Sequence, residues 1–549
     1  SSPDMRRGVE GEQGIMNLSG SRSTTPALMV LGTASHAGKS VVTAALGRIL
    51  ADEGFRVAPF KAQNMSLNSA ATPEGEEIGR AQALQAEACR IPACAEMNPV
   101  LIKPSSDTGS QIVVLGRVWA QVTASDYHLH RVEELFPTVL AAYEKLAQQY
   151  DVIVLEGAGS PAEINLREHD IVNMRMARAA NAACLLVGDI DRGGAFASLL
   201  GTLQLLDDSE RSLIRGYAIN KFRGDVSLLQ PGIEMMAPRL GIPCAGVIPY
   251  LHNLNLDEED GVAIEDRRTV VRAWTSNGRE NSSARPLRIG VLALPHISNF
   301  TDFDPLAAEP SVELAYLERP EHLASADLVI LPGSKQTLDD LEWLHRNLFG
   351  EALLQAYKQG ALIAGICGGF QMLGMQIEDP AGVENAGSPS ARDGFRLLPI
   401  RTVLNRVKVT RRAVGKCATA ILGQAPISAS FRGYEIHMGE TIYGGTATPF
   451  AEIRREGAGD TLWDGAVGLE GRVFGTYMHG LFDDDDFRHD FIDAARRARH
   501  LPAAHAYSFV AREREARLDR LADHVRRSLD VPLILRWMNL LPRRVGQTA

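Results

Sequence analysis

A cysteine between glycines is the residue best placed to do chemistry in this sequence. Cys367 lies in GALIAGICGGFQMLG, after a hydrophobic run and before Gly368, Gly369 and a helical pattern. Small neighbours permit the tight strand-to-helix turn of a nucleophile elbow. A helix N-terminus favours the thiolate, which is the reactive form of cysteine. Cys184 and Cys244 lie in or at the start of predicted strands, so we expect them to be inert.

A thiolate nucleophile needs a base that is close to it in space. His479, in GTYMHGLF, follows a predicted strand and precedes Gly480, and it is the best candidate. His437, in GYEIHMGET, is the second choice. The loop LPGSKQT ends an earlier strand, and we predict that the backbone N–H groups of Gly333 and Gly368 form an oxyanion hole. Together these residues predict nucleophilic attack by a thiolate on a carbonyl group.

A second set of residues, near the start of the chain, is typical of phosphate binding. The segment GTASHAGKS at 32–40 lies between a hydrophobic run and a helical pattern, and it ends in Gly38-Lys39-Ser40 like a P-loop. The loop is one residue longer than the usual motif, so Thr33 takes the place of the first glycine. Backbone N–H groups at a helix N-terminus favour phosphate. Lys39 is expected to reach the terminal phosphates of the ligand, and Ser40 to bind Mg²⁺.

Two polar residues follow other predicted strands. Glu156 ends the run DVIVLEG, at the carboxyl edge where open α/β sheets bind ligands. A carboxylate there can hold Mg²⁺ directly or through water, although a helix-capping or solvated glutamate is the alternative. Asn220, in NKFRGD, follows another strand, where its amide can contact a purine edge or simply form part of a turn.

The elements that position these residues alternate between short apolar runs and helical periodicity. The predicted strands of the first part are residues 27–32, 56–61, 151–157, 183–189, 216–221 and 244–250. Helical patterns between them, such as 39–53 and 131–149, predict a doubly wound α/β fold with a mostly parallel sheet. A second βα series begins with strands at 287–294, 326–333 and 360–367, followed by an antiparallel set from about 394 to 480.

Composition shifts divide the chain into five predicted parts. A polar stretch containing SNGRENSSARP separates the two βα series. Residues 510–528 carry apolar side chains at helical spacing, which predicts a docked amphipathic helix. The predicted parts are a flexible tail (1–26), a P-loop domain (27–256), a linker (257–286), a second α/β domain (287–500) and a C-terminal helical segment (501–549).

Composition excludes several classes of protein. The 549 residues include 57 Lys and Arg against 67 Asp and Glu, a formal charge of −10, so no basic surface for a nucleic acid is indicated. No apolar run reaches about 18 residues, which argues against a membrane span. Six cysteines without a CxxC pair indicate neither a disulfide scaffold nor a zinc ribbon. We therefore expect a cytoplasmic protein.

The motifs of the two halves, taken together, resemble those of a known group of enzymes. A P-loop half, a G-x-C-G-G elbow and a late G-x-Y-x-H-G resemble the glutamine-dependent amidotransferases of corrin biosynthesis, and the P-loop half is similar to dethiobiotin synthetase. Further blocks resemble the cobyric acid synthase family, and together they extend from residue 27 to about 530: PFKAQNMSLNS, EIGRAQALQAEA, MNPVLIKP, EGAGSPAEINL, DIDRGGAFASL, NKFRGD and GYEIHMGET.

The resemblance implies a fold, a reaction and site residues. It implies a dethiobiotin synthetase-like P-loop domain followed by a class I glutaminase-like α/β domain. The implied reaction amidates the b, d, e and g carboxylates of the corrin substrate adenosylcobyrinic acid a,c-diamide, using ATP with Mg²⁺ and ammonia from glutamine, through an acyl phosphate. It also implies that Asn220 contacts adenine, and that GT-x-x-x-x-GK[ST] is a regular form of the phosphate loop.

One position departs from the class I glutaminase pattern. These enzymes carry a glutamate two residues after the histidine, and here that residue is Leu481. Either one of the aspartates Asp483, Asp484, Asp485 and Asp486 replaces it, or the histidine acts without a carboxylate. We favour the second hypothesis, a Cys367–His479 dyad, because the aspartate run is typical of a solvated turn before a helix.

Two other functions remain as alternatives. Cobyrinic acid a,c-diamide synthase performs the same chemistry on other carboxylates. The KAQNMSLNS block and the absence of that enzyme's usual P-loop sequence argue against it. A partitioning-type P-loop ATPase is the more distant alternative, although it has no use for a thiol elbow. The sequence contains no D-x-H-x-x-G cobalt-ligand signature, which predicts peripheral contact with a corrin.

Overall fold

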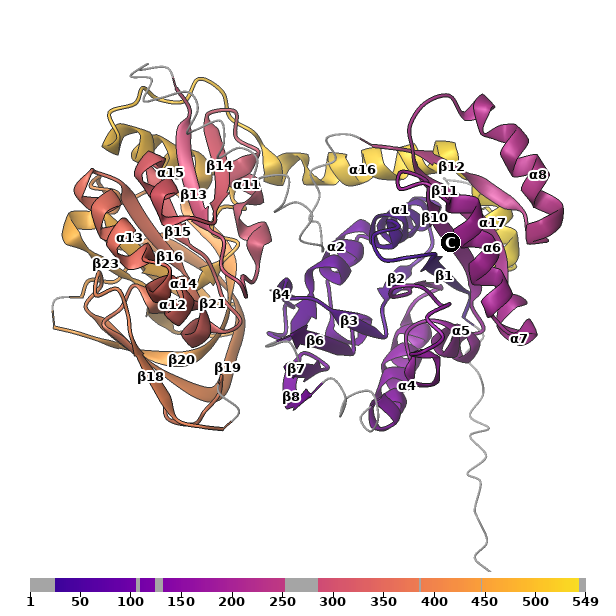
Figure 1. Ribbon diagram of the computed structural model, residues 1–549, viewed down its shortest axis with the longest axis horizontal. Helices are drawn as coiled ribbons and strands as arrows, with labels where there is room; N and C mark the ends of the chain where they lie inside the picture. Colours follow the sequence, from indigo (N-terminus) through magenta and orange to yellow (C-terminus); the bar gives the residue numbers. More distant parts are fainter. Residues whose placement is uncertain are drawn as a thin grey trace, which may run out of the picture.

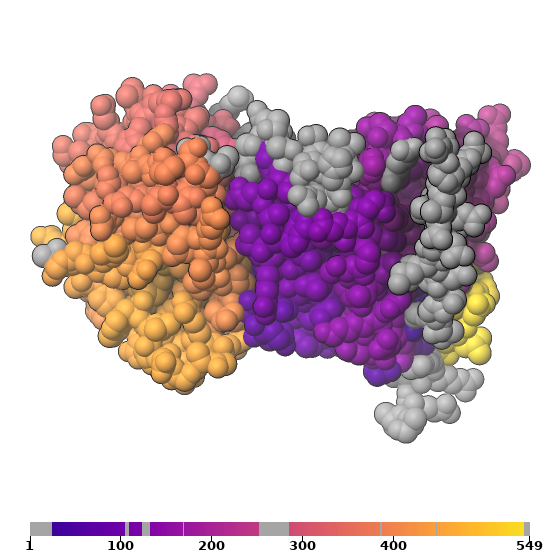
Figure 2. All heavy atoms as spheres, turned by 90° about the horizontal axis from the view of Figure 1, so that it is seen from below, coloured from indigo at the N-terminus to yellow at the C-terminus, as the bar shows by residue number. Residues whose placement is uncertain are grey.

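The computed structural model describes residues 25–104, 109–123, 132–251, 285–384, 387–445 and 447–542. These residues form two α/β lobes, and the helix α16 (Val510–Ser528) runs from one lobe to the other (Figure 1). We call residues 25–251 with the last two helices the first lobe, and residues 285–508 the second lobe. Figure 2 shows the two lobes in contact with each other.

The first lobe is built on a six-stranded sheet in which every pairing is parallel. Its order is β12-β11-β10-β1-β9-β2. All residues of the two strands that precede the phosphate loop and Glu156 are buried, as expected for a sheet covered on both faces. The strands are β1 (Ala27–Gly32), β2 (Val57–Phe60), β9 (Val152–Glu156), β10 (Ala183–Asp189), β11 (Ile214–Phe222) and β12 (Cys244–Pro249).

Helices cover both faces of this sheet, and each face has its own apolar core. One core joins α1 (Lys39–Asp52) and α2 (Arg80–Ala88) to the two C-terminal helices. The other core joins the sheet to helices of the opposite face: α4 (Val132–Gln149), α5 (Met174–Ala180), α6 (Ala195–Leu205) and α8 (Gln230–Leu240). A short α7 (Asp208–Arg211) precedes β11. The predicted doubly wound fold is confirmed.

Two small sheets of the first lobe lie on the side that faces the second lobe (Figure 1). Their strands are three to seven residues long, and the sequence analysis missed them. β3 (Gln63–Met65), β6 (Val100–Pro104), β7 (Gly109–Val114) and β8 (Arg117–Thr123) form one sheet, while β4 (Ser69–Ala71) and β5 (Glu77–Gly79) form the other. β4 contacts the long strands β19 and β20 of the second lobe.

The second lobe contains a six-stranded sheet of order β14-β13-β15-β16-β24-β23. Its pairings are parallel except that of β23 with β24. The strands are β13 (Leu287–Leu292), β14 (Val312–Leu317), β15 (Leu328–Leu331), β16 (Leu362–Ile366), β23 (Ala466–Gly468) and β24 (Val473–Thr476). Helices α11 (Asp304–Ala307), α12 (Thr337–Arg346), α13 (Phe349–Lys358), α14 (Gly368–Met372) and α15 (Asp485–Ala498) pack around it.

The predicted antiparallel region forms a seven-stranded sheet, in which only β17 with β19 is parallel. Two long strands form its centre, and the last strand, β25, carries His479. The members are β17 (Gln376–Asp379), β18 (Ser390–Asp393), β19 (Ile400–Cys417), β20 (Ser430–Tyr443), β21 (Ala451–Arg455), β22 (Thr461–Asp464) and β25 (Met478–His479).

The end of the chain returns to the first lobe. Leu518, Leu521 and Val525 of α16 are buried in the core that also holds α1, so the predicted amphipathic helix is present and docked there. Arg48 of α1 is fully buried, and its guanidinium binds Asp519 of α16. α17 (Val531–Trp537) joins the same core. The predicted tail and linker lie almost wholly outside the described residues. Among the described residues, no helix is long and apolar enough to cross a membrane.

Candidate active site

Cys367 stands at a sharp turn between β16 and α14. Its backbone has φ 51° and ψ −109°, and its N–H donates to the carbonyl of Thr476 on β24 at 2.8 Å. A positive φ is costly for a residue with a side chain, and such strain persists only where the surroundings fix it. The thiol is almost buried and lies 3.5 Å from the carbonyl oxygen of Ile436. This is the predicted nucleophile elbow.

The turn requires glycines around the thiol, because neighbouring backbone atoms leave no room for a side chain at these positions. A Cβ at Gly365 would lie 2.7 Å from the carbonyl oxygen of Gly369, and one at Gly369 would lie 2.0 Å from that of Leu331. A Cβ at Gly368 would lie 3.0 Å from the backbone nitrogen of Ser334. The loop after β15 therefore touches the elbow, as the oxyanion-hole prediction for Gly333 and Gly368 requires. That the N–H groups of Gly333 and Gly368 point toward a substrate oxyanion stays a prediction.

His479 is the histidine that the fold brings to the thiol. It is buried, lines the same pocket as Cys367, and approaches the loop so closely that a Cβ at Gly333 would lie 3.2 Å from its Cε1. Tyr434 of β20 stacks on the imidazole at a ring distance of 5.5 Å. The second choice, His437, also lines the pocket, but its ring stacks on Tyr477 at 3.8 Å.

A carboxylate partner of His479 comes from a distant part of the chain. The imidazole Nδ1 lies 2.6 Å from Oδ2 of Asp302, whose other oxygen accepts the N–H of Gly480 at 3.1 Å. Asp302 is buried in a 3-10 helix, Phe300–Phe303, that follows β13. The favoured hypothesis of a dyad without a carboxylate is therefore wrong. The structure has a Cys367–His479–Asp302 triad, and Asp302 fixes the ring orientation as in other triads.

The electrostatics of the triad favour a charged imidazole. Burial lowers the pKa of His479, but the charges of Asp302 and of a Cys367 thiolate, with hydrogen bonds to both, raise it to about 10. At neutral pH the imidazole is thus held as an imidazolium beside the thiol. An imidazolium can give its proton to a departing amine, which is the role of a general acid.

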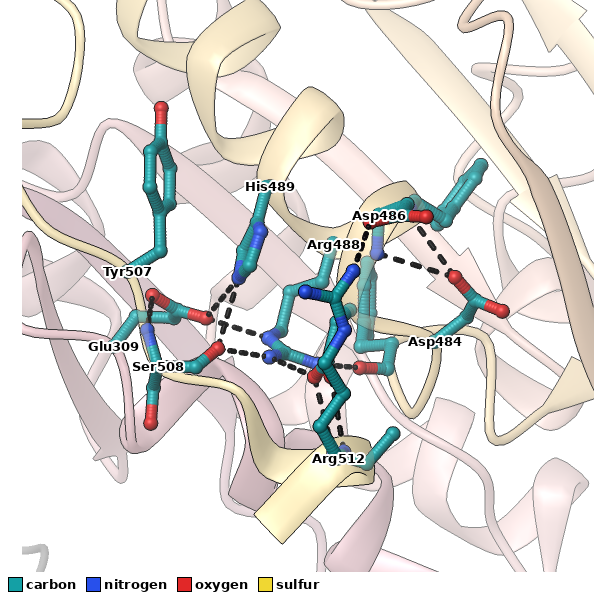
Figure 3. A network of polar contacts seen from close by, with 12 residues as sticks. Glu309, Asp484, Asp486, Arg488, His489, Tyr507, Ser508 and Arg512 are labelled. Atoms are coloured by element: carbon teal, nitrogen blue, oxygen red, sulfur yellow. Dashed lines mark hydrogen bonds and ion pairs between the residues drawn. The ribbon is translucent and has the colours of Figure 1, made fainter.

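The aspartate run after His479 has structural partners instead (Figure 3). Asp484 caps α15 by accepting the N–H of Asp486. Asp485 binds the buried guanidinium of Arg488 and accepts the N–H groups at the start of α16. Arg488 also binds Glu309 at 2.7 Å. Asp483 lies 3.5 Å from Arg80 of the first lobe. These contacts anchor α15 and α16, and none of these aspartates is the partner of His479.

We expect that replacing Asp302 with Asn lowers kcat/KM for glutamine hydrolysis by about 10³-fold, because the imidazolium loses its charge partner. The pKa of His479 falls when the carboxylate is removed. The alkaline limb of the pH–rate profile therefore moves to lower pH, a change that a merely structural role would not produce.

Asp484→Asn is the matched control for this variant, since it makes the same change at a surface cap. Its turnover should stay within about tenfold of the parent enzyme. The triad assignment is wrong if both variants lose activity equally, or if Asp302→Asn leaves the pH profile unmoved.

The first lobe carries the predicted phosphate loop at the carboxyl end of β1. Gly38 has φ 91° and immediately precedes α1, which begins at Lys39. The ammonium group of Lys39 donates to the carbonyl oxygens of Ala34 and Gly159, both at 3.0 Å, so it spans the loop and the segment after β9. The loop therefore opens onto a helix N-terminus, where the macrodipole favours phosphate.

Glu156 lies beside the loop, as predicted. Its Oε1 accepts the hydroxyl of Ser40 at 2.7 Å and the ammonium of Lys61 at 3.0 Å, and its Oε2 accepts the amide of Gln85. Burial raises the pKa of Glu156, but the charge of Lys61 and these hydrogen bonds hold it below its usual range. An ionised carboxylate and a hydroxyl thus stand together. Among the described residues no group of three or more His, Cys, Asp or Glu forms a metal cluster.

Asn220 supports the phosphate loop in this structure. Its amide nitrogen donates to the carbonyl oxygen of Ala37 at 2.9 Å, and a Cβ at Gly38 would lie 2.2 Å from that nitrogen. Lys221, which follows, donates to the carbonyl of His36 and to Asp189. The NKFRGD segment therefore supports the loop through hydrogen bonds to its carbonyl oxygens. An adenine contact by Asn220 stays a prediction.

The pocket at the thiol is shared by the two lobes. Lys103 of β6 lines it together with Cys367 and His479. Next to it, the backbone of Ser69 on β4 exchanges hydrogen bonds with the side chain of Asn299 at 3.3 and 3.2 Å. The hydroxyl of Tyr434 donates to the carbonyl of Ser69 at 3.1 Å. The first lobe thus touches residues that adjoin both Asp302 and the His479 ring.

Comparisons with known proteins agree with this geometry. A family model described as the CobQ/CobB/MinD/ParA nucleotide binding domain matches residues 28–264, and one described as the CobB/CobQ-like glutamine amidotransferase domain matches residues 288–487. With the phosphate loop and the thiol triad, they define a glutamine-hydrolysing carbon–nitrogen ligase with an ATP-binding domain.

Three relatives narrow this class. Proteins named cobyric acid synthase from Citrobacter koseri and Photorhabdus laumondii are 47% and 46% identical over 513 and 515 residues, covering 93% of this chain and 98% of each relative. The protein of that name from Sorangium cellulosum is 46% identical over 529 residues, covering 94% and 99%. The chain belongs to the cobyric acid synthase family.

Proposed function

We propose that this protein amidates the b, d, e and g carboxylates of adenosylcobyrinic acid a,c-diamide to give adenosylcobyric acid, with ATP as the activating reagent and glutamine as the nitrogen source. The observation that carries the proposal is the presence in one chain of a Cys367–His479–Asp302 triad and a phosphate loop ending in Lys39. The high identity to cobyric acid synthases along nearly the whole chain supports the choice of substrate.

The reaction needs activation in the first lobe. A carboxylate does not react with ammonia in water, so the γ-phosphoryl group of ATP is first transferred to it, which gives an acyl phosphate and ADP. We assign to Lys39, whose ammonium group spans the loop and the segment after β9, the role of offsetting the charge on the transferred group. The loop N–H groups and the N-terminus of α1 bind the remaining phosphates.

Mg²⁺ fits the residues beside the loop. Ser40 and the ionised Glu156 are oxygen donors 2.7 Å apart, and hard oxygen ligands are those that Mg²⁺ prefers. When bound, the ion would neutralise phosphate charge. Lys61 and Gln85 keep Glu156 ionised and oriented for this role.

Ammonia is supplied by the second lobe. The Cys367 thiolate attacks the side-chain carboxamide of glutamine, the His479 imidazolium gives its proton to the departing ammonia, and water then cleaves the thioester to release glutamate. Because residues of both lobes line the thiol pocket, ammonia is released at their interface. From there it attacks the acyl phosphate and displaces phosphate, before bulk water can protonate it.

Mass spectrometry tests the proposal directly. The corrin a,c-diamide is incubated with ATP, Mg²⁺ and glutamine, and we expect four successive products, each lighter by the difference between a hydroxyl and an amino group. Cobyrinic acid without the two amides is the comparison substrate. Amidation of that compound at the a and c positions, with none of the a,c-diamide, would instead identify a cobyrinic acid a,c-diamide synthase.

A further inference from the structure

Three lysines converge on the pocket at Cys367. Lys103 comes from β6 of the first lobe, Lys408 from β19 of the second, and Lys335 from the loop between β15 and α12. All three line the pocket that holds the thiol and His479. We call them the lysine cluster. The triad chemistry uses none of them.

Two members of the lysine cluster share one carboxylate. Oε1 of the fully buried Glu77 accepts the ammonium of Lys103 at 2.7 Å, and its Oε2 accepts that of Lys408. The hydroxyl of Ser69 donates to the same carboxylate at 2.8 Å. Burial raises the pKa of Glu77, but the charges of Lys103 and Lys408 hold it below its usual range. The single carboxylate of Glu77 therefore pairs with two ammonium groups, those of Lys103 and Lys408.

Lys335 is the third amino group of the lysine cluster. Among the described residues, no carboxylate lies within ion-pair distance of its ammonium group. Glu384, which also lines the pocket, is tied to the start of α12, where it accepts the N–H of Leu338 at 2.9 Å. Burial and the neighbouring charges of Lys408 and Lys103 lower the pKa of Lys335 to about 7. The pocket thus holds three amino groups against the carboxylates of Glu77 and Glu384, and a bound anion would stabilise the charged form of Lys335.

The backbone fixes where Lys335 stands. Its N–H donates to the carbonyl of His296 at 3.0 Å. The preceding Ser334 donates its hydroxyl to Asp340 at 2.6 Å, and Asp340 also binds the ring of His296 at 2.8 Å. This loop carries Gly333 as well, so the lysine and the oxyanion-hole candidate belong to one rigid segment. Such pre-organisation is typical of a binding site.

We infer that Lys335, with Lys103 and Lys408 beside it, binds the α-carboxylate of glutamine, and that the first lobe thereby completes the glutamine site. The inference rests on the proposed function only in taking this pocket as the place where glutamine reacts. A substrate whose carboxamide lies at Cys367 has one anionic group, separated from the carboxamide by a short carbon chain. That carboxylate can pair with the ammonium group of Lys335, which has no ion-pair partner among the described residues.

The test compares two nitrogen donors that differ only in this group. Ammonia release is measured from L-glutamine and from its α-amide, which has no carboxylate, for the parent enzyme and for Lys335→Met. The parent should prefer glutamine roughly 100-fold in kcat/KM. In Lys335→Met the value for glutamine should fall by a similar factor, mainly through KM, while that for the amide stays, so the preference nearly disappears.

Two further variants show whether the loss depends on the α-carboxylate. Lys416 is an exposed lysine on the same strand as Lys408, and Lys416→Met should leave kcat/KM for both donors unchanged. Lys335→Gln repeats the test if the Met variant is not stably folded. Equal losses for both donors would overturn the inference, because they indicate a structural role.

Amidation driven by free ammonia separates glutamine from the other carboxylate source, the corrin. If Lys335→Met raises the KM for the corrin in that reaction, the pocket binds a corrin carboxylate and the inference is wrong. If the parent enzyme amidates no corrin from either nitrogen source, the proposed function fails, while the comparison of the two donors still decides the role of Lys335.

Discussion

Replacing Cys367 with Ala removes glutamine-dependent amidation completely and leaves amidation by free ammonia at the rate of the parent enzyme. Without the sulfur no thioester forms, and loss of the nucleophile from a triad costs about 10⁶-fold in turnover. Alanine has the same Cβ as cysteine and no larger side chain, so the variant should keep the strained turn at φ 51°. In the proposed mechanism the acyl phosphate forms in the first lobe and reacts with ammonia from either source.

The measurement is mass spectrometry of the corrin products with glutamine or with ammonium chloride at alkaline pH. Cys244→Ala is the matched control, because this partly buried cysteine of β12 lies in the other lobe and should lose neither reaction. Failure of ammonia to support amidation in a folded Cys367→Ala protein would contradict two separable sites. It would indicate that an intact thiol is needed for the first lobe to work.

Residues whose role depends on local structure could be predicted from the sequence. The elbow at Cys367 and the loop at Lys39 each follow a buried parallel strand and open a helix, so hydrophobic patterning and a few glycines define them. Glu156 and Ser40 were expected at one edge because the carboxyl ends of parallel strands meet there, and the structure places them 2.7 Å apart.

Asp302 could not be found in this way, because nothing local connects it with His479. The two residues are 177 positions apart, and the chain passes through β14, β15, β16, β23 and β24 before they meet. The position of the usual glutamate, two residues after the histidine, holds the buried Leu481. The signal that could have found it was the polar segment SNFTD after a core strand. Its Ser298, Asn299, Thr301 and Asp302 are all nearly buried, and buried polar groups need partners.

The lobe interface escaped prediction for a related reason. Strands of three residues, such as β4 and β5, are too short to show an alternating pattern, yet they carry Ser69 and Glu77 to the second lobe. Lys103 and Lys408 lie on strands, where lysines usually face solvent. Their ammonium groups meet on Glu77, so that Lys408 of the second lobe contacts a carboxylate of the first, and such a contact has no signature in either segment alone.

Lys39→Ala is expected to reduce amidation by more than about 10³-fold with both nitrogen donors, because it removes a charge from the phosphoryl-transfer step that both routes share. The Lys39 ammonium is held between the carbonyl oxygens of Ala34 and Gly159, so the variant loses the charge that spans the loop and the segment after β9. Glutamine hydrolysis should continue, since the triad lies in the other lobe.

Corrin amidation and glutamate release, measured in the same samples, therefore separate the two steps. Lys358→Ala, an exposed lysine at the end of α13, is the control and should retain both. A Lys39→Ala protein that still amidates with ammonia would place the lysine outside the activation step. Loss of glutamate release together with amidation would have a different meaning. The triad would then depend on an occupied phosphate loop, and the contacts of Ser69 with Asn299 and Tyr434 are among those that join the two lobes near the triad.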